Sequence, residues 1–192
     1  MFGFGLVGDL IAQGKLRFDG KRILLFNNPI SFIPLRMVVK TIKSVHESSD
    51  PSLLYRACRD ETISWLEGMV RDFNLRETDM IDWGLKIEEF SGWGKVVVRD
   101  IKPDEKQVVS EILDSAVAIE YQKLFGKAER AVDDVLRGMQ AGASSMVHHA
   151  EMEAFELSCI AKGDASCTMV VKQRSLFDFN DAEVIRQIGA KR

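Results

Sequence analysis

A short run near the C-terminal end of the chain places one glutamate and two cysteines around a turn. Glu156, Cys159 and Cys167 form the pattern E-x-x-C-x-A-x-G-D-x-x-C. The thiols stand equally far from Gly163, so a hairpin turning on residues 162–164 would set them opposite each other, with Cβ atoms about 5 Å apart. Zinc accepts thiolate and carboxylate ligands in a tetrahedral shell. Because Glu156 and Cys159 point to opposite faces of a regular strand, a shared ion requires a bulge or a strand end between them.

Spacing alone leaves two other interpretations of these cysteines open. In one, both thiols are small buried hydrophobic groups and Glu156 is a solvated strand residue. In the other, a disulfide crosses the hairpin, although the expected reducing compartment and the strain of such cross-strand pairs argue against it. The chain has three cysteines, and Cys58 lies far from the other two, so the pattern is not a disulfide framework. We expect Cys58, which lies in a helical stripe beside Ala57, to be part of the hydrophobic core.

Composition favours one domain without a nucleic-acid or membrane partner. The 192 residues, 46% of them hydrophobic, can bury a core as a single domain over 1–192, with 1–15 as an N-terminal helix or extension and 16–192 as the main domain. The 26 basic and 29 acidic side chains are scattered, so no phosphate-binding face is predicted. No stretch approaches the roughly 20 apolar residues of a spanning helix. Asp9 interrupts the first apolar run, and we expect a cytoplasmic protein.

Hydrophobic periodicity predicts an α+β fold in which an antiparallel sheet of hairpins packs with helices. A first hairpin pairs residues 16–18 with 23–26 and is followed by a break at 27–29, and residues 107–121 begin as strand and continue as helix. The closing hairpin joins 152–161 to 167–172. A further strand is predicted at 96–101, and helices at 31–45, 51–73, 77–90, 128–147 and 181–188.

The helix over 128–147 carries a face with almost no side chains. Gly138 and Gly142 lie four residues apart, and glycine inside a helix is costly enough to need a reason. The reason is tight helix-to-sheet contact or a backbone wall beside a ligand cavity. His148 and His149 are predicted to form a polar helix end, and His46 a solvated helix terminus. The sequence has no P-loop, dinucleotide fingerprint or nucleophile elbow.

The cysteine motif and the helix together resemble a known family. Gly138, Gly142 and Ser145 match a G-x-x-x-G-x-x-S helix, and residues 20–24 through 32–35 look like an opening strand and helix. This chain resembles the 4-vinyl reductase domain family, whose members include sensing domains of bacterial regulators that respond to aromatic compounds. That fold is similar to the ligand-binding fold of NO-signalling proteins and of small subunits of a Golgi vesicle-tethering complex, which can hold an acyl chain or small ligand.

The resemblance also implies a set of site residues. In the zinc-containing sensors a cysteine of the long helix holds the metal together with the hairpin's Glu and two Cys, and this chain has Asp133 at the helix position. The implied site is therefore a structural zinc ion held by Asp133, Glu156, Cys159 and Cys167, which pins the hairpin to the long helix. A hydrophobic ligand would lie in an apolar cavity beside Gly138, Met139 and Gly142.

The function expected from these residues is small-molecule binding or sensing. Four protein ligands leave no open position on zinc for an activated water, so the metal would contribute to folding and not to catalysis. One alternative is a reductase of a vinyl-tetrapyrrole-like substrate, which would need a nicotinamide or flavin donor for which no motif is seen. The other is a scaffold subunit of a larger assembly. A homodimer and output through a separate protein are expected as well.

Overall fold

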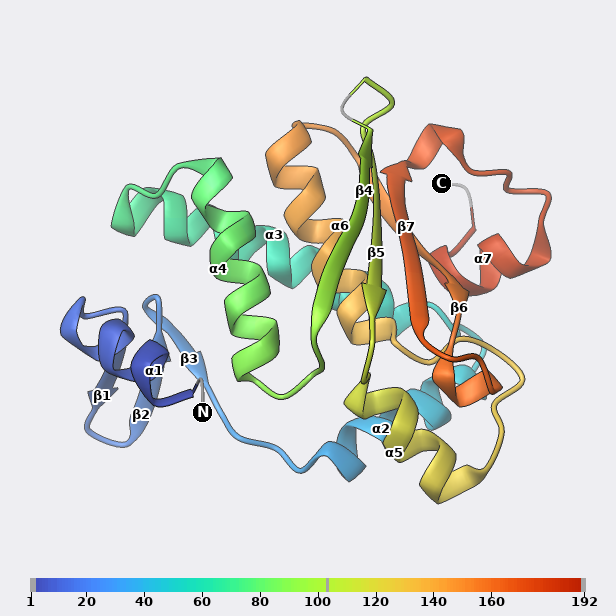
Figure 1. Cartoon of the computed structure of the whole chain (residues 1–192), viewed down its shortest axis with the longest axis horizontal. Coiled ribbons are helices and arrows are strands. Elements are labelled where there is room, and N and C mark those ends of the chain that lie inside the picture. The colour runs from blue at the N-terminus through green and yellow to red at the C-terminus, as the bar shows by residue number, and fades with distance from the viewer. Residues whose placement is uncertain (1–2, 103, 191–192) are drawn as a thin grey trace.

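Two antiparallel sheets organise the chain, which a computed structural model describes over residues 3–102 and 104–190. The first sheet has the order β1-β2-β3, with β1 at Leu16–Asp19, β2 at Arg22–Leu25 and β3 at Asn28–Ile30. The second has the order β4-β5-β7-β6, and Figure 1 shows it at the centre of the molecule. Its strands are β4 (Val96–Lys102), β5 (Gln107–Ile112), β6 (Met152–Ser158) and β7 (Cys167–Gln173).

Seven helices are found in the described ranges. They are α1 (Gly3–Ala12), α2 (Leu35–His46), α3 (Leu53–Phe73), α4 (Glu77–Phe90), α5 (Ala116–Phe125), α6 (Asp134–His148) and α7 (Ala182–Ile188). The α+β class predicted from the sequence is therefore confirmed. None of these helices combines the length and the apolar character needed to cross a bilayer.

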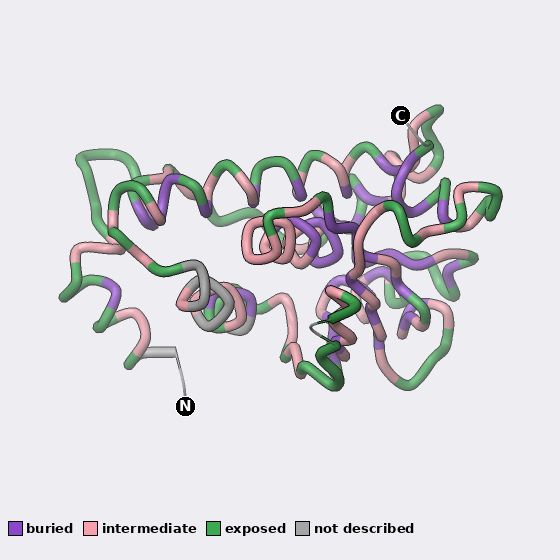
Figure 2. The backbone as a smooth tube through the Cα atoms, turned by 90° about the horizontal axis from the view of Figure 1, so that it is seen from above, coloured by how far each residue is buried: buried purple, intermediate pink, exposed green. Residues whose placement is uncertain are grey.

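Helix α6 is the central element of the main body, which consists of the large sheet and the helices packed around it. It packs against β6 and β7 of the large sheet on one side and along α3 on the other, while α4 contacts both α6 and β4. Helices α2 and α5 pack together at the end of the sheet where β7 begins, and α7 packs on β6 (Figure 1). Buried residues gather where α6 meets its neighbours, as the view in Figure 2 shows.

The N-terminal sheet is held to the C-terminal half of α3 by aromatic packing. Phe26 is fully buried, and its ring meets Trp65, Phe73 and Trp83 edge to face, with ring centroids 6.4, 5.4 and 5.6 Å away. Such edge-to-face pairs add about 0.5–1.5 kcal/mol each to the gain from burial. Residues 16–30 therefore pack on the same long helix that supports the main body. In Figure 1 this small sheet lies at the opposite end of the molecule from α7.

Several predicted boundaries differ from the observed ones, among them the end of the strand predicted over 152–161, which is Ser158. Asn28–Ile30 forms a third strand where the sequence predicted only a break, because Phe26 and Asn27 adopt positive φ and turn the chain back onto β2. Helix α2 begins after Pro34 and not at residue 31. Helix α6 begins at Asp134 and not at 128, because Ala128 N–H donates to the Ala161 carbonyl and holds the preceding segment against the hairpin.

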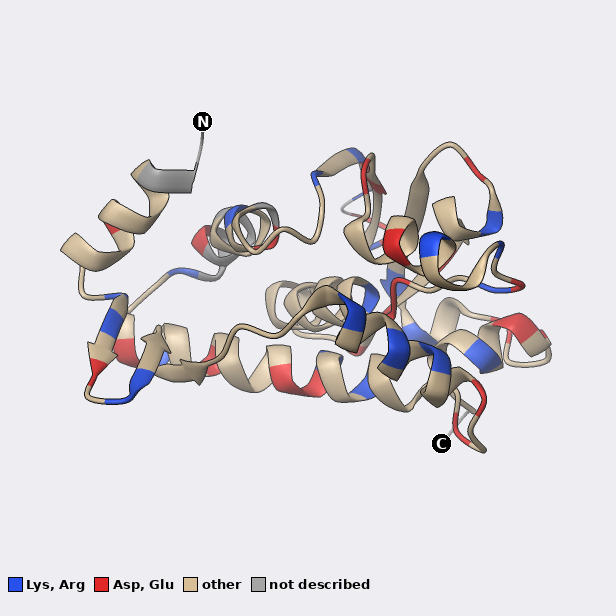
Figure 3. Cartoon of the chain, turned by 90° about the horizontal axis from the view of Figure 1, so that it is seen from below, with Lys and Arg blue, Asp and Glu red and all other residues tan. Residues whose placement is uncertain are grey.

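Acidic and basic residues are interspersed along the ribbon in Figure 3, in keeping with the formal net charge of −3. Nucleic-acid binding is predicted to be absent on these grounds, and it stays a prediction.

Candidate metal centre and apolar cavity

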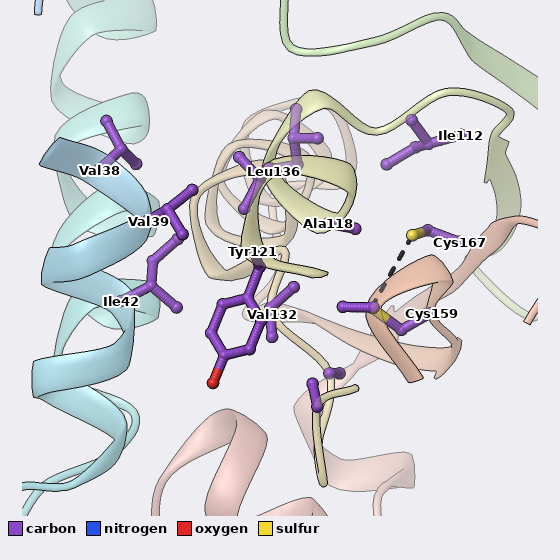
Figure 4. Close-up of a cluster of buried hydrophobic side chains, with 14 of the residues drawn as sticks. Val38, Val39, Ile42, Ile112, Ala118, Tyr121, Val132, Leu136, Cys159 and Cys167 are labelled. Carbon is purple, nitrogen blue, oxygen red and sulfur yellow. Dashed lines mark hydrogen bonds between the residues drawn. The ribbon is translucent and has the colours of Figure 1, made fainter. Parts of the chain in front are cut away.

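The structure brings the four predicted metal ligands together. One donor atom from each of Asp133, Glu156, Cys159 and Cys167 lies within 4.8 Å of every other, and all four residues are buried. The two sulfur atoms are 3.9 Å apart, and the close-up in Figure 4 shows the thiols facing each other among apolar side chains. Two soft and two hard donors in one buried cluster make a plausible metal site.

An irregularity at the end of β6 lets Glu156 and Cys159 reach the same side. The register of β6 against β7 shifts between Glu156 and Ser158, and the strand ends at Ser158. The bulge or strand end that the sequence required is therefore present. A 3-10 turn over Ile160–Lys162 follows, and the Cys159 N–H donates to Asp164 Oδ2 at 2.8 Å.

The hairpin turn closes with a glycine in the left-handed region. Gly163 has φ of +95°, which an L side chain rarely adopts, so the turn depends on glycine at this position. Cys167 then opens β7, and the Ile160 N–H points at its sulfur from 3.3 Å. The short turn between the cysteines thus orients one backbone donor toward the metal cluster.

Asp133 reaches the cluster from the residue before α6. It is the N-cap residue of that helix, with φ −85° and ψ 44°, and its side chain is fully buried. Ser115 Oγ donates to Asp133 Oδ1 at 2.6 Å, and the Asp133 N–H donates to Glu156 Oε2 at 3.2 Å. Each carboxylate thus has one oxygen hydrogen-bonded to a neighbour.

The other oxygen of each carboxylate accepts no hydrogen bond from the described residues by the geometric criteria of distance and angle. Asp133 Oδ2 and Glu156 Oε1 are buried and unpartnered within the described part of the chain. Orphaned buried oxygens are rare because each costs about 1–3 kcal/mol of desolvation, and more when charged. These two oxygens lie beside the two thiols, so all four groups could share one cation.

Protonation in the cluster follows from burial and from mutual repulsion. Burial raises the pKa of Glu156 well above its ordinary value, with the Asp133 charge adding to the effect, and burial raises the pKa of Asp133. The hydrogen bond from Cys167 lowers the pKa of Cys159 to about 7, and the same bond raises the pKa of Cys167. A bound cation would lower the pKa of all four groups, because metal ligands bind in their deprotonated forms.

A buried ion-pair network lies directly behind Asp133. His46 Nε2 is 2.6 Å from Asp134 Oδ2, and Arg137 Nη2 donates to Asp134 Oδ1 at 2.7 Å. Burial opposes the Asp134 charge, but Arg137 and His46 hold the pKa of Asp134 below its ordinary value. The prediction that His46 is a solvated helix terminus is wrong, because only 6% of its side chain is exposed.

Helix α7 contacts the candidate metal centre through the side chain of Gln187. The Glu156 N–H donates to Gln187 Oε1 at 2.8 Å, and Gln187 Nε2 donates back to the Glu156 carbonyl at 3.1 Å. Arg137 Nη1 donates to the Gln187 carbonyl at 2.9 Å. The last helix thus fixes the backbone of Glu156, a candidate metal ligand. The sequence motif did not reveal this contact.

Gly138 and Gly142 face α3 and not the sheet. A Cβ on Gly138 would come within 2.6 Å of the Tyr55 carbonyl oxygen, and one on Gly142 within 2.7 Å of the Arg59 carbonyl oxygen. The glycines predicted a close approach of this helix to a neighbour, and the neighbour is the helix α3. Met139 lies elsewhere, on the wall of an apolar groove between the N-terminal sheet and α4. Ligand binding by these three residues stays a prediction.

A second feature, which sequence reasoning missed, is an apolar cavity between α4, α6 and the large sheet. Its volume is about 120 Å³. Its walls come from the sheet and from both helices, and its apolar side chains include Leu85, Val96, Val98, Val108, Val147 and Val171. Val98 and Ile101 on the outer strand β4 are partly exposed, which puts the mouth of the cavity at this edge of the sheet.

A few polar groups line the same cavity. Glu88 of α4 is 4% exposed, its Oε2 has no hydrogen-bond partner among the described residues, and burial raises its pKa to about 8. Ser110 Oγ donates to Gln140 Oε1 at 2.7 Å, and Gln140 Nε2 is likewise buried without a partner. Gly84, Leu85 and Glu88 share one helical face, a spacing that could have marked Glu88 as facing inward.

Comparison with known proteins identifies solved structures that share this fold. No family model matches the chain, and no curated protein sequence matches it. Among solved structures, the phenol-responsive sensory domain of the transcription activator PoxR, crystallised with phenol, matches with a TM-score of 0.73 at 17% identity over 100% of both chains. The chain has the fold of this sensory domain.

Two further solved structures are similar to part of this chain. A trafficking protein particle complex subunit 3 from Naegleria fowleri, covalently bound to palmitic acid, matches with a TM-score of 0.51 at 12% identity, over 72% of this chain and 93% of the other. A vinyl-4-reductase family protein from Methanocaldococcus jannaschii matches with a TM-score of 0.49 at 16% identity, over 74% and 83%. The fold expected from the sequence resemblance is confirmed.

Proposed function

We propose that this protein is a small-molecule-binding domain that holds a hydrophobic ligand in the cavity between α4, α6 and the large sheet. The observation that carries the proposal is an apolar cavity of about 120 Å³ with buried polar groups that lack partners. Ligand pockets combine apolar walls with a few such groups, which orient the ligand. A dry apolar cavity of about 150 Å³ can hold benzene, so the expected ligand has about one ring.

The proposal includes a structural zinc ion held by Asp133, Glu156, Cys159 and Cys167. The unpartnered oxygens and the two thiols fit such an ion, since zinc would provide the positive charge that the buried carboxylates lack. Four protein ligands would complete its shell and leave no position for a reactive water. Bound zinc would fasten the β6–β7 hairpin to the segment that precedes α6.

The ligand half of this proposal is tested by filling the cavity. Ser144 of α6 lines it, so Ser144→Phe should abolish the rise in melting temperature that wild-type protein shows with excess benzyl alcohol. Ser64→Phe, at an exposed position of α3, makes the same chemical change outside the cavity and should keep that rise. Equal stabilisation of both variants would show that the ligand binds elsewhere.

The metal half has its own experiment. Protein loaded with zinc should melt at a lower temperature after treatment with a chelator, and added zinc should restore the original value. An unchanged melting temperature, with zinc shown to be removed, would contradict a structural role. A homodimer, a separate output protein and a cytoplasmic location belong to the same proposal, while the reductase and scaffold alternatives stay predictions.

A further inference from the structure

Five acidic side chains are buried in the described part of the chain, and among them Glu88 alone lies neither in an ion pair nor in the candidate metal centre. Asp134 pairs with Arg137 and His46, and Glu153 pairs with Arg59 and Arg174. Asp133 and Glu156 share the candidate metal centre. Within residues 3–102 and 104–190 Glu88 makes no ion pair, its Oε2 has no hydrogen-bond partner, and the residue lines the cavity.

An unpaired carboxyl group in an apolar wall destabilises the fold when it is charged, so its presence says something about the ligand. A buried carboxylate without a partner is strongly destabilising, so the group stays protonated or acquires a positive charge beside it. Burial alone raises the pKa of Glu88. No charged group among the described residues stabilises its carboxylate form. A ligand that enters the cavity is the remaining source of such a charge.

The other groups in and around the cavity do not supply a positive charge to Glu88. His148 also lines it, but burial and the nearby Lys106 lower the pKa of His148, so its ring is neutral. The charged side chains of β4, the strand that packs against α4, are exposed: Arg99, Asp100 and Lys102. The Gln140 amide can offer either its N–H or its carbonyl oxygen, since the Ser110 hydroxyl that meets it can donate or accept.

We propose that the ligand of this cavity is a small apolar amine, bound as its ammonium ion by the carboxylate of Glu88. This inference rests on the proposed function and narrows its ligand to one chemical class. The apolar walls take a body of about one ring, and the carboxylate takes the charged head. A neutral alcohol of the same shape would leave the carboxyl group protonated and would gain a single uncharged hydrogen bond.

Calorimetric titration near pH 7 with benzylamine, benzyl alcohol and toluene tests the inference, because the three probes share a ring and differ in the head group. Wild-type protein should bind benzylamine at least about 30-fold more tightly than benzyl alcohol. Binding of the ammonium ion should also release a proton from Glu88, which appears as a dependence of the measured heat on the ionisation enthalpy of the buffer.

Two variants complete the experiment. Glu88→Gln should weaken benzylamine binding by about 30-fold and change benzyl alcohol binding by only a few fold, while Glu61→Gln, at an exposed position of α3, should bind as wild type does. If the neutral probes bind and benzylamine binds no better, or if Glu88→Gln leaves benzylamine binding intact, the amine class is wrong and the cavity proposal survives. If none of the three probes binds wild-type protein, the proposed function fails, and this inference fails with it.

Discussion

Replacing Gly138 by alanine should loosen the packing of α6 on α3. An added Cβ would lie 2.6 Å from the Tyr55 carbonyl oxygen, 2.6 Å from Cys58 Cβ and 2.9 Å from the Arg59 nitrogen. Two of these atoms belong to the backbone of α3 and cannot rotate away. The shorter contacts must open from 2.6 Å to at least 3.0 Å, so the two helices have to separate.

The size of the effect follows from two opposing terms. Overpacking a close contact costs about 1–3 kcal/mol, and a clash with backbone on the facing helix belongs at the upper end of that range. Alanine gains about 1 kcal/mol over glycine inside a helix. Gly138→Ala should therefore lower the free energy of unfolding by about 2 kcal/mol, which for a chain of this length lowers the melting temperature by about 4–8 °C.

Urea denaturation and thermal melting measure this loss, and Gly84→Ala is the matched control. Gly84 lies inside α4 with no atom within 4 Å of an added Cβ, so this variant should be more stable than wild type by up to about 1 kcal/mol. If Gly138→Ala melts as wild type does and loses ligand binding, Gly138 acts as the wall of a ligand site, and the packing argument is refuted.

Three more predictions concern the buried acids. Folded Glu88 holds its proton up to about pH 8 while the unfolded chain releases it near pH 4.5, so wild-type stability falls as the pH rises between these values. Glu88→Gln should therefore reduce the loss of unfolding free energy from about pH 5 to about pH 8 by roughly 3 kcal/mol in urea titrations, and parallel pH profiles would contradict it. His46→Ala removes one partner of the buried Asp134 carboxylate and should destabilise the fold by about 2 kcal/mol in the same assay, whereas no change would mean that the pair is not formed. Glu156→Gln should weaken zinc binding at least about tenfold in competition with a chromophoric chelator, while the exposed Glu151→Gln should not; equal affinities would exclude Glu156 as a ligand.

Local sequence patterns predicted the elements around the metal cluster well. The symmetric spacing about Gly163 indicated the hairpin, and the opposite faces of Glu156 and Cys159 required the irregularity that β6 shows. Asp133 came from a family resemblance and not from periodicity. Its segment was predicted as helix, because the hydrogen bond from Ala128 to the hairpin carbonyl, which holds this segment outside the helix, is a long-range contact.

Features that depend on where helices meet were not predictable in the same way. The sequence indicated a close approach at Gly138 but not the partner, which is α3 and not the sheet. His46 looked like a helix end, because its partner Asp134 is far away in the sequence. Glu88 drew no attention, since an acidic residue on a helix is usually solvated and only the meeting of α4, α6 and β4 buries it.

Native mass spectrometry of the purified protein, with benzyl alcohol added, tests the central claim most directly because it reports metal and ligand together. We predict one zinc ion per chain, lost from protein that carries Glu156→Gln, and one ligand molecule per chain, lost from Ser144→Phe. Wild-type protein that folds without any metal and takes up no ligand at saturating concentration would contradict the account.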